Sequence, residues 1–87
     1  MAWQVVLSRQ AVKDANKLAR AGLKSRTEVL LHVLRSGPLQ APPRYEKLVG
    51  NLSGIYSRRI NIQHRLVYRI DQQKQVVHVL RMWTHYK

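Results

Sequence analysis

The chain has 87 residues, with 16 lysines and arginines against 4 aspartates and glutamates, so its formal charge is +12. A charge of this size on one small domain predicts a polyanionic partner: a nucleic acid, an anionic membrane surface or a strongly acidic protein. The absence of cysteine excludes a disulfide framework, a zinc ribbon and a thiol nucleophile.

The composition also argues against metal and membrane classes. No bound metal or other cofactor is expected, because acidic residues are scarce and the four histidines show no close metal-ligand spacing. No apolar run is long enough to cross a membrane, and the first residues lack the pattern of a signal peptide. We therefore expect a cytoplasmic protein without a membrane partner, folded as a single domain over residues 1–87.

The first half of the sequence predicts one strand and two helices. Residues 3–7 are rich in β-formers, and Ser8 is a candidate N-cap for a helix that ends at Gly22. A second helix is expected from Ser25, which stands three residues before a glutamate as in a capping box, to the Gly-Pro pair at 37–38. Each helix has one apolar stripe, so the two should form a hairpin that packs on a sheet.

The second half predicts that sheet. Residues 37–44 contain all three prolines and form a connector, and residues 50–54 form a turn or loop. Three strands are expected after it, at 55–62, 65–70 and 75–83. The expected fold class is α+β: a small twisted antiparallel sheet, element order β-α-α-β-β-β, with the two-helix hairpin packed on one face.

Side-chain alternation along these strands separates a core face from a basic face. The even-numbered positions are mostly apolar and predict the core: Ile60, Ile62, Leu66, Tyr68, Ile70, Val76, Leu80 and Met82. The odd-numbered positions carry four arginines without an acid: Arg59, Arg65, Arg69 and Arg81. Arginine suits bidentate contact with phosphate, and Trp83 and Tyr86 are placed to stack on bases. This face favours nucleic-acid binding, with an acidic protein partner or a merely solvated face as alternatives.

Two scarce groups are candidates for proton transfer. Glu46 is either a general base or one half of a surface ion pair with Arg44 or Lys47. His85 is either a general acid or a solvated histidine near the end of the chain. Cleavage of RNA by its own 2′-OH needs a base, an acid and a cation for the extra phosphate charge. Glu46, His85 and Arg65 together would supply all three without a metal.

The sequence resembles a known toxin family over residues 44–87. Three stretches carry the resemblance: Tyr45-Glu46-Lys47-Leu48-Val49-Gly50-Asn51-Leu52-Ser53-Gly54-Ile55-Tyr56-Ser57-Arg58-Arg59-Ile60, His64-Arg65-Leu66-Val67-Tyr68, and Arg81 with His85-Tyr86. Together they are similar to the YoeB/Txe toxins. These toxins are mRNA endoribonucleases of the RelE superfamily, from bacterial type II toxin–antitoxin systems. The first half of the chain matches this family only in the order and length of its elements.

The resemblance implies ribosome-dependent cleavage of mRNA in the A site, with metal-independent acid–base chemistry. It assigns Glu46 as general base, His85 as general acid and Arg65 as the cation that stabilises the transition state. It further implies that Arg59 positions phosphate and that Tyr86 helps to order the site. Lys47, Arg58, Arg69 and Arg81 are the remaining expected RNA or phosphate contacts. Family members carry a lysine where this chain has Val49, and Lys47 is expected to take its place.

The resemblance also implies partners. The expected ones are a cognate antitoxin with an acidic segment (of the YefM or Phd kind), the ribosome with its mRNA, and operator DNA bound through the antitoxin complex. A partly apolar patch on the basic face permits a homodimer. Two other functions remain open: a non-enzymatic basic module that binds RNA or DNA, and an inactive toxin relative that serves as antitoxin partner and co-repressor of its operon.

Overall fold

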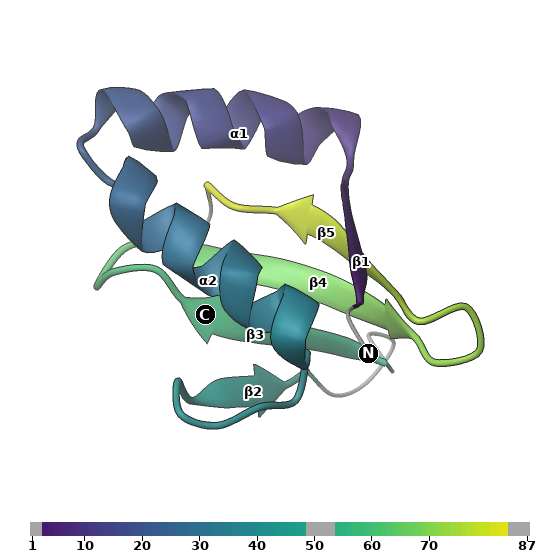
Figure 1. The fold of residues 1–87 in the computed structure, drawn as a ribbon. Helices are drawn as coiled ribbons and strands as arrows, with labels where there is room; N and C mark the ends of the chain where they lie inside the picture. Colours follow the sequence, from purple (N-terminus) through teal and green to yellow (C-terminus); the bar gives the residue numbers. More distant parts are fainter. Residues whose placement is uncertain (1–2, 49–53, 84–87) are drawn as a thin grey trace.

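The computed structural model describes residues 3–48 and 54–83, which form two helices over one face of a sheet (Figure 1). The order of elements agrees with the predicted α+β class, with one additional short strand before the last three. The elements are β1 (Gln4–Leu7), α1 (Arg9–Arg20), α2 (Lys24–Ser36), β2 (Tyr45–Lys47), β3 (Ile55–Arg59), β4 (Arg65–Asp71) and β5 (Val76–Arg81).

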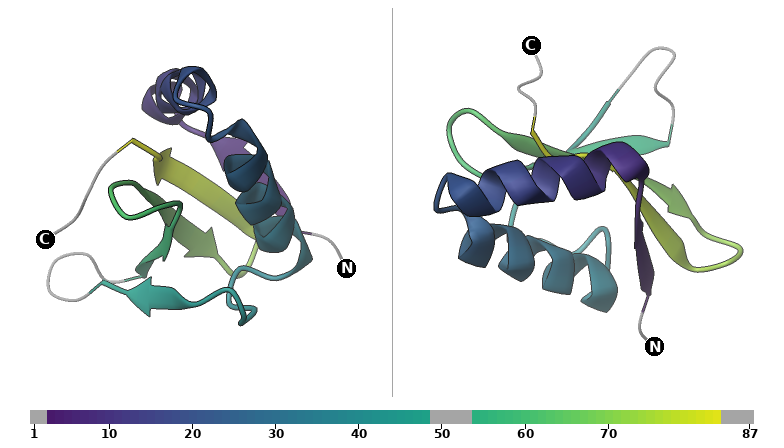
Figure 2. Two further views of the ribbon diagram at one scale, coloured as in Figure 1. Left: turned by 90° about the vertical axis from the view of Figure 1, so that its left-hand side faces the viewer. Right: turned by 90° about the horizontal axis from the view of Figure 1, so that it is seen from above.

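The sheet is mixed, where the sequence predicts a wholly antiparallel one. Its strand order is β1-β5-β4-β3-β2, and β1 lies parallel to β5 whereas the other neighbours are antiparallel. The two helices carry the chain from one edge of the sheet to the other, so β1 and β2 lie on opposite edges. The meander from β2 to β5 then returns the chain to β1. Both views of Figure 2 show α1 and α2 on the same side of the sheet.

The hydrophobic core fills the space between the helices and the sheet. Ala11 and Leu18 of α1 and Leu30 and Leu34 of α2 are buried. Across from them lie the buried side chains of the sheet and its flanks: Ile60, Leu66, Tyr68, Val77, Val79 and Met82. Burial of this apolar surface stabilises two helices that would be too short to persist alone.

The two helix starts differ in how well the sequence predicts them. Ser8 is the N-cap of α1, as predicted: its hydroxyl accepts from the Ala11 N–H at 3.0 Å and donates to the Leu80 carbonyl at 2.8 Å. Ser25, in contrast, is not the N-cap of α2. That helix begins one residue earlier, at Lys24. Leu23 is its N-cap residue, and the Leu23 side chain packs against the core.

The predicted core is wrong for β5 because of a loop length. Val77 and Val79 are fully buried, whereas the sequence pattern places Val76 and Leu80 in the core. The four residues between β4 and β5 pair Asp71 with Val76, and this even-numbered loop sets odd positions opposite even ones as far as Tyr68 and Val79, where the register shifts by one residue. The five-residue loop between β3 and β4 preserves parity, so the prediction holds for β4.

The predicted strand over 55–62 ends early. The Asn61 side chain accepts hydrogen bonds from the backbone N–H groups of Gln63 and His64, which closes a turn directly after β3. Ile62 lies in this turn and is 90% exposed, so its prediction as a core residue is wrong.

A buried carboxylate holds the end of β5 against α1. Asp14 is fully buried, and its Oδ2 accepts from Arg81 Nε at 2.9 Å and from the Met82 N–H at 3.0 Å. Gln10 donates to the other oxygen at 3.1 Å. Burial raises the pKa of Asp14, but these donors, with the Trp83 backbone, outweigh it and hold that pKa below its usual value.

A buried arginine holds the connector before β2. The Arg58 side chain is 1% exposed, and its guanidinium donates to the carbonyls of Pro43, Pro38 (2.9 Å) and Gln40 (2.8 Å). The same guanidinium lies 5.2 Å from the ring centre of Tyr45. This arrangement fixes the path of the chain from α2 to β2.

A tyrosine supports the same connector. The Tyr68 hydroxyl donates to the Pro38 carbonyl at 2.8 Å. Burial raises the pKa of Tyr68, against an opposing effect of the Arg58 charge, so the hydroxyl keeps the proton that it donates.

We predict that Asp14→Asn lowers the free energy of unfolding at about pH 7 by about 2 kcal/mol, because charged hydrogen bonds are lost. The folded pKa lies below the unfolded one, so Asp14 stabilises fully above about pH 4. This contribution is lost as pH falls through the folded pKa. Urea unfolding should therefore show a smaller difference between the two proteins at about pH 3. Glu28→Gln, at an exposed position, is the control, and a difference that does not shrink contradicts the assignment.

We predict that Arg58→Lys lowers the free energy of unfolding by about 3 kcal/mol, because one ammonium group cannot donate to all three carbonyls that the planar guanidinium reaches. Hydrogen exchange of the Leu48 N–H, which donates to the Ile55 carbonyl at 2.9 Å, should accelerate as β2 loosens. Arg59→Lys changes the exposed neighbour and should leave stability unchanged. Equal stability of the two variants would refute the role of Arg58.

Candidate active site

The site lies on the sheet face opposite the helices, at the edge formed by β2. A cavity of about 310 Å³ opens there. It is lined by Arg44, Glu46, Ser57, Arg59 and Arg65. Four of these five side chains come from the strands β2, β3 and β4, and Arg44 directly precedes β2.

Strand register explains why these side chains share one face. Glu46 pairs with Ser57, and Arg59 pairs with Arg65. Directly paired residues point to the same side of a sheet, and so do positions two apart along a strand. Their neighbours Tyr45 and Tyr56 point to the other side, where the two rings meet edge to face at 5.9 Å.

An ion pair lies within the cavity. Arg65 Nη1 is 3.1 Å from Glu46 Oε1, and the Glu46 side chain is 50% exposed. An ion pair this open to water contributes about 0–1 kcal/mol to stability, so the fold does not need it. The carboxylate is held in place and yet remains open to a ligand.

The cavity carries a surplus of positive charge. Three arginines line it against one carboxylate, and within residues 3–48 and 54–83 neither Arg44 nor Arg59 pairs with an acid. Guanidinium groups bind phosphate oxygens in a bidentate manner. The arrangement therefore suits a ligand with phosphate groups beside a group that can give up a proton to Glu46.

The structure brings together only some of the expected site residues. Glu46, Arg65 and Arg59 line one cavity, as the hypothesis requires. Arg69 is exposed on the same face but lies four positions along β4 from Arg65, roughly 13 Å at strand rise. Arg69 is therefore near the cavity without lining it.

Three expected phosphate contacts are corrected by the structure. Arg58 is buried and its guanidinium donates to connector carbonyls, so it is not free to bind RNA. Arg81 lies beyond the register shift of β5, and its Nε pairs with Asp14 of α1 at 2.9 Å, which holds the guanidinium toward that helix. Lys47 pairs with Tyr56 and alternates with Glu46, so it points to the opposite face.

Two residues missed by the sequence analysis also line the cavity. Arg44 is expected only as an ion-pair partner of Glu46, yet Arg65 takes that place. Ser57 has no assigned role, although its odd position on the basic face was the signal that could have found it. Its hydroxyl is buried and has no hydrogen-bond partner among the residues that the structure describes.

The expected general acid His85, and Tyr86 beside it, lie outside the described residues. The described chain ends at Trp83, two positions after Arg81. Arg81 is in register with Val67, which is in turn in register with Ser57. The end of β5 is therefore one strand away from β4, which carries Arg65, and two strands away from Ser57 on β3.

Trp83 does not stand free to stack on a base. Its ring stacks on the ring of His64, with centroids 4.0 Å apart, and Lys17 Nζ lies 5.9 Å from its centre. His64 is itself buried, so this stack packs the last described residue against the β3–β4 turn.

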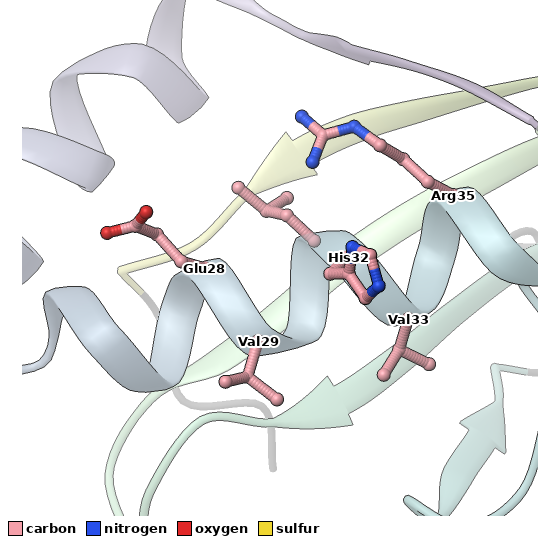
Figure 3. A pocket seen from close by; sticks show the side chains of 6 residues that line it. Glu28, Val29, His32, Val33 and Arg35 are labelled. Carbon is pink, nitrogen blue, oxygen red and sulfur yellow. The ribbon is translucent and has the colours of Figure 1, made fainter.

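A second hollow, of about 620 Å³, lies on the outer face of α2, around Val29, His32 and Val33 (Figure 3). All of its lining side chains belong to this one helix. Figure 3 shows Glu28 and Arg35 at opposite ends of the group, with His32 between them along the helix. Glu28, His32 and Arg35 form no contact with one another comparable to the Glu46–Arg65 ion pair.

The described residues hold neither a metal-binding cluster nor a membrane-spanning helix. Within the part of the chain that the structure describes, no cluster of three or more histidines and acidic residues could hold a metal ion. The helices described are too short and too polar to cross a membrane.

Comparisons with known proteins agree on one family. The family described as "YoeB-like toxin of bacterial type II toxin-antitoxin system" matches residues 8–86. The toxin YoeB of a Synechocystis species is 38% identical over 55 residues, which are 63% of this chain and 64% of that protein. The chain thus covers slightly less than two thirds of this relative.

Solved structures extend the similarity over nearly the whole chain. A YoeB/ParE toxin from Agrobacterium tumefaciens has a TM-score of 0.85 at 27% identity, covering 95% of this chain and 99% of its own. YoeB from Staphylococcus aureus, solved as a dimer and in complex with YefM, has a TM-score of 0.78 at 32% identity, covering 99% and 100%. Because the family match spans residues 8–86, the chain belongs to the YoeB-like toxins of bacterial type II toxin–antitoxin systems.

Proposed function

We propose that this toxin is a ribosome-dependent endoribonuclease that cleaves mRNA in the A site by attack of a 2′-OH on the adjacent phosphate. In this step the 2′-oxygen gives up its proton and bonds to phosphorus, while the bond from phosphorus to the 5′-oxygen of the next nucleotide breaks. The chain must supply a base for the first oxygen, an acid for the second and cations for the charge on phosphate.

Glu46 is the proposed base. Its carboxylate is open to a ligand from the cavity, and it is held there by Arg65 at 3.1 Å. The contact with Arg65 holds the carboxylate at the cavity, where it can accept the 2′-OH proton. Carboxylates are rare in this chain, so one at the centre of three arginines supports a chemical role.

Arg65 is the proposed transition-state cation. Its side chain reaches the same cavity from β4 and is only 20% exposed, so its position is well defined. As negative charge builds up on the phosphate oxygens, the guanidinium gains a partner that it lacks in the ground state. Arg44 and Arg59 border the same cavity and position the flanking phosphates.

His85 is the proposed general acid, with Tyr86 ordering the site, on the strength of the family resemblance. His85 and Tyr86 follow Trp83, the last described residue, by two and three positions, and their approach to the cavity is part of the proposal.

The observation that carries the proposal is the Glu46–Arg65 pair within a cavity lined by two further arginines. A binding module for RNA would need the arginines but not the carboxylate, which repels phosphate. The net charge of +12 fits a substrate presented by the ribosome, because a polyanionic surface attracts the toxin before the site is engaged.

The proposed partners follow from the same charge. A cognate antitoxin with an acidic segment, of the YefM or Phd kind, would neutralise the arginines and block the cavity, and with the toxin it would repress their operon. The Staphylococcus aureus relative was solved with YefM and as a dimer, which supports an antitoxin partner and a homodimer for this chain.

We predict that Glu46→Gln, Arg65→Ala and His85→Gln each slow cleavage of ribosome-bound mRNA by about 10²-fold or more, the usual contribution of an acid–base group. Cleavage is measured in a translation extract by mapping the RNA ends. Glu28→Gln and Arg35→Ala, on the outer face of α2, are matched controls that keep full activity. Cleavage by Glu46→Gln and Arg65→Ala at the native rate would contradict the assignment of the site. Intact mRNA with every protein, the unmutated toxin included, would favour a non-enzymatic binding module.

We predict that Arg44→Ala weakens binding to an RNA whose 2′-OH groups are methylated and which is therefore not cleaved. Loss of one phosphate contact should also reduce the slope of log affinity against log salt by about 1. Arg9→Ala, at an exposed position on α1, is the charge-matched control. An unchanged salt slope for Arg44→Ala would place its guanidinium outside the RNA path.

A further inference from the structure

Ser57 is one of the residues that line the active-site cavity, and its buried hydroxyl has no hydrogen-bond partner among the described residues. The residue is 1% exposed, and within the described part of the chain no group accepts from or donates to its Oγ. Buried polar groups in folded proteins are nearly always paired, because an unpaired one loses its bonds to water without replacement. A buried hydroxyl kept in this state at an active site points to a hydrogen bond that forms only during the reaction.

The position of Ser57 limits which partner that is. In the ladder its two neighbours are Glu46 on β2 and Val67 on β4. Val67 has no polar side-chain atom, whereas the Glu46 carboxylate is a strong acceptor. Residues directly opposite in an antiparallel pair have Cβ atoms about 4.5–5.5 Å apart, so a rotation of the Glu46 side chain brings its carboxylate to the hydroxyl.

Burial of the oxygen disfavours RNA as the partner. Ser57 Oγ is closed to solvent, so a phosphate or ribose entering the cavity cannot reach it without displacing protein atoms. A side chain that already borders Ser57 can reach the hydroxyl. Glu46 has that position, and its described partner at rest is Arg65.

We propose that Ser57 is a positioning residue that donates a hydrogen bond to the Glu46 carboxylate when RNA is bound. The inference rests on the proposed function, in which Arg65 turns to the phosphate as its charge develops. Glu46 then loses the donor that orients it at rest. The Ser57 hydroxyl, fixed by the packing of β3, replaces that donor and keeps the carboxylate directed at the 2′-OH.

This role predicts opposite effects of one substitution on stability and on activity. Ser57→Ala removes an unpaired buried hydroxyl, so the temperature of unfolding should stay the same or rise. The same change should lower kcat for ribosome-bound mRNA about tenfold and leave KM within twofold, because only orientation in the reacting complex is lost. Ser57→Thr keeps the hydroxyl and should recover most of kcat, and the exposed Ser25→Ala is the matched control.

A double-mutant cycle separates this proposal from the proposed function. In the Glu46→Gln background, Ser57→Ala should cause no further loss of residual cleavage, because the two residues act through one contact. If Glu46→Gln is inactive while Ser57→Ala cleaves at the native rate, the role of Ser57 is wrong and the site stands. If Glu46→Gln itself is fully active, the site assignment fails as well. A loss of stability in Ser57→Ala that accounts for its loss of activity would assign Ser57 a structural role only.

Discussion

The site depends on one buried arginine, Arg58, that does not line the cavity. Arg58 donates to three carbonyls of the proline-rich connector and packs beside Tyr45, and this fixes where the chain enters β2. Only a guanidinium has enough donors in one plane to satisfy carbonyls at residues 38, 40 and 43 together. Because β2 has just three residues, the connector decides the register that sets Glu46 opposite Ser57. Two adjacent arginines of β3 thus have different roles. Arg58 binds the connector on one face of the sheet, and Arg59 lines the cavity on the other.

The other constraint is charge. A chain with a formal charge of +12 attracts RNA with many of its side chains, but attraction alone performs no reaction. Two of its few carboxylates form ion pairs among the described residues, and their roles differ. Asp14 is fully buried, bonded by Arg81 and Met82, and closes the end of β5 onto α1. Glu46 is half exposed and held by one arginine inside a cavity, which leaves it free to take a proton. Burial therefore separates the structural carboxylate from the proposed catalytic one.

The sequence was sufficient for the fold class, for the Ser8 cap and for the family, because these depend on local periodicity and on long motifs. It was insufficient where a single residue changes the outcome. The even-numbered β4–β5 loop reverses the parity of β5 and so moves Val77 and Val79 into the core, and the buried Asp14 binds Arg81 at α1. Composition could not distinguish Arg58 from Arg59, since burial is decided by which face of β3 meets the connector. Ser57 was overlooked because a serine in a strand is unremarkable until its hydroxyl is found buried and unpaired. His85 and Tyr86 stay predictions, because they lie outside the described residues.

The chemistry of the cut ends tests the central claim most directly. If Glu46 takes a proton from a 2′-OH, the upstream fragment of ribosome-bound mRNA must end in a 2′,3′-cyclic phosphate, or the phosphate formed by its opening, and the downstream fragment must begin with a 5′-OH. A message with one 2′-deoxynucleotide just before the scissile phosphate must resist cleavage at that bond. Fragments with 3′-OH and 5′-phosphate ends, or cleavage of the deoxy-substituted bond at the native rate, would contradict this account of the site.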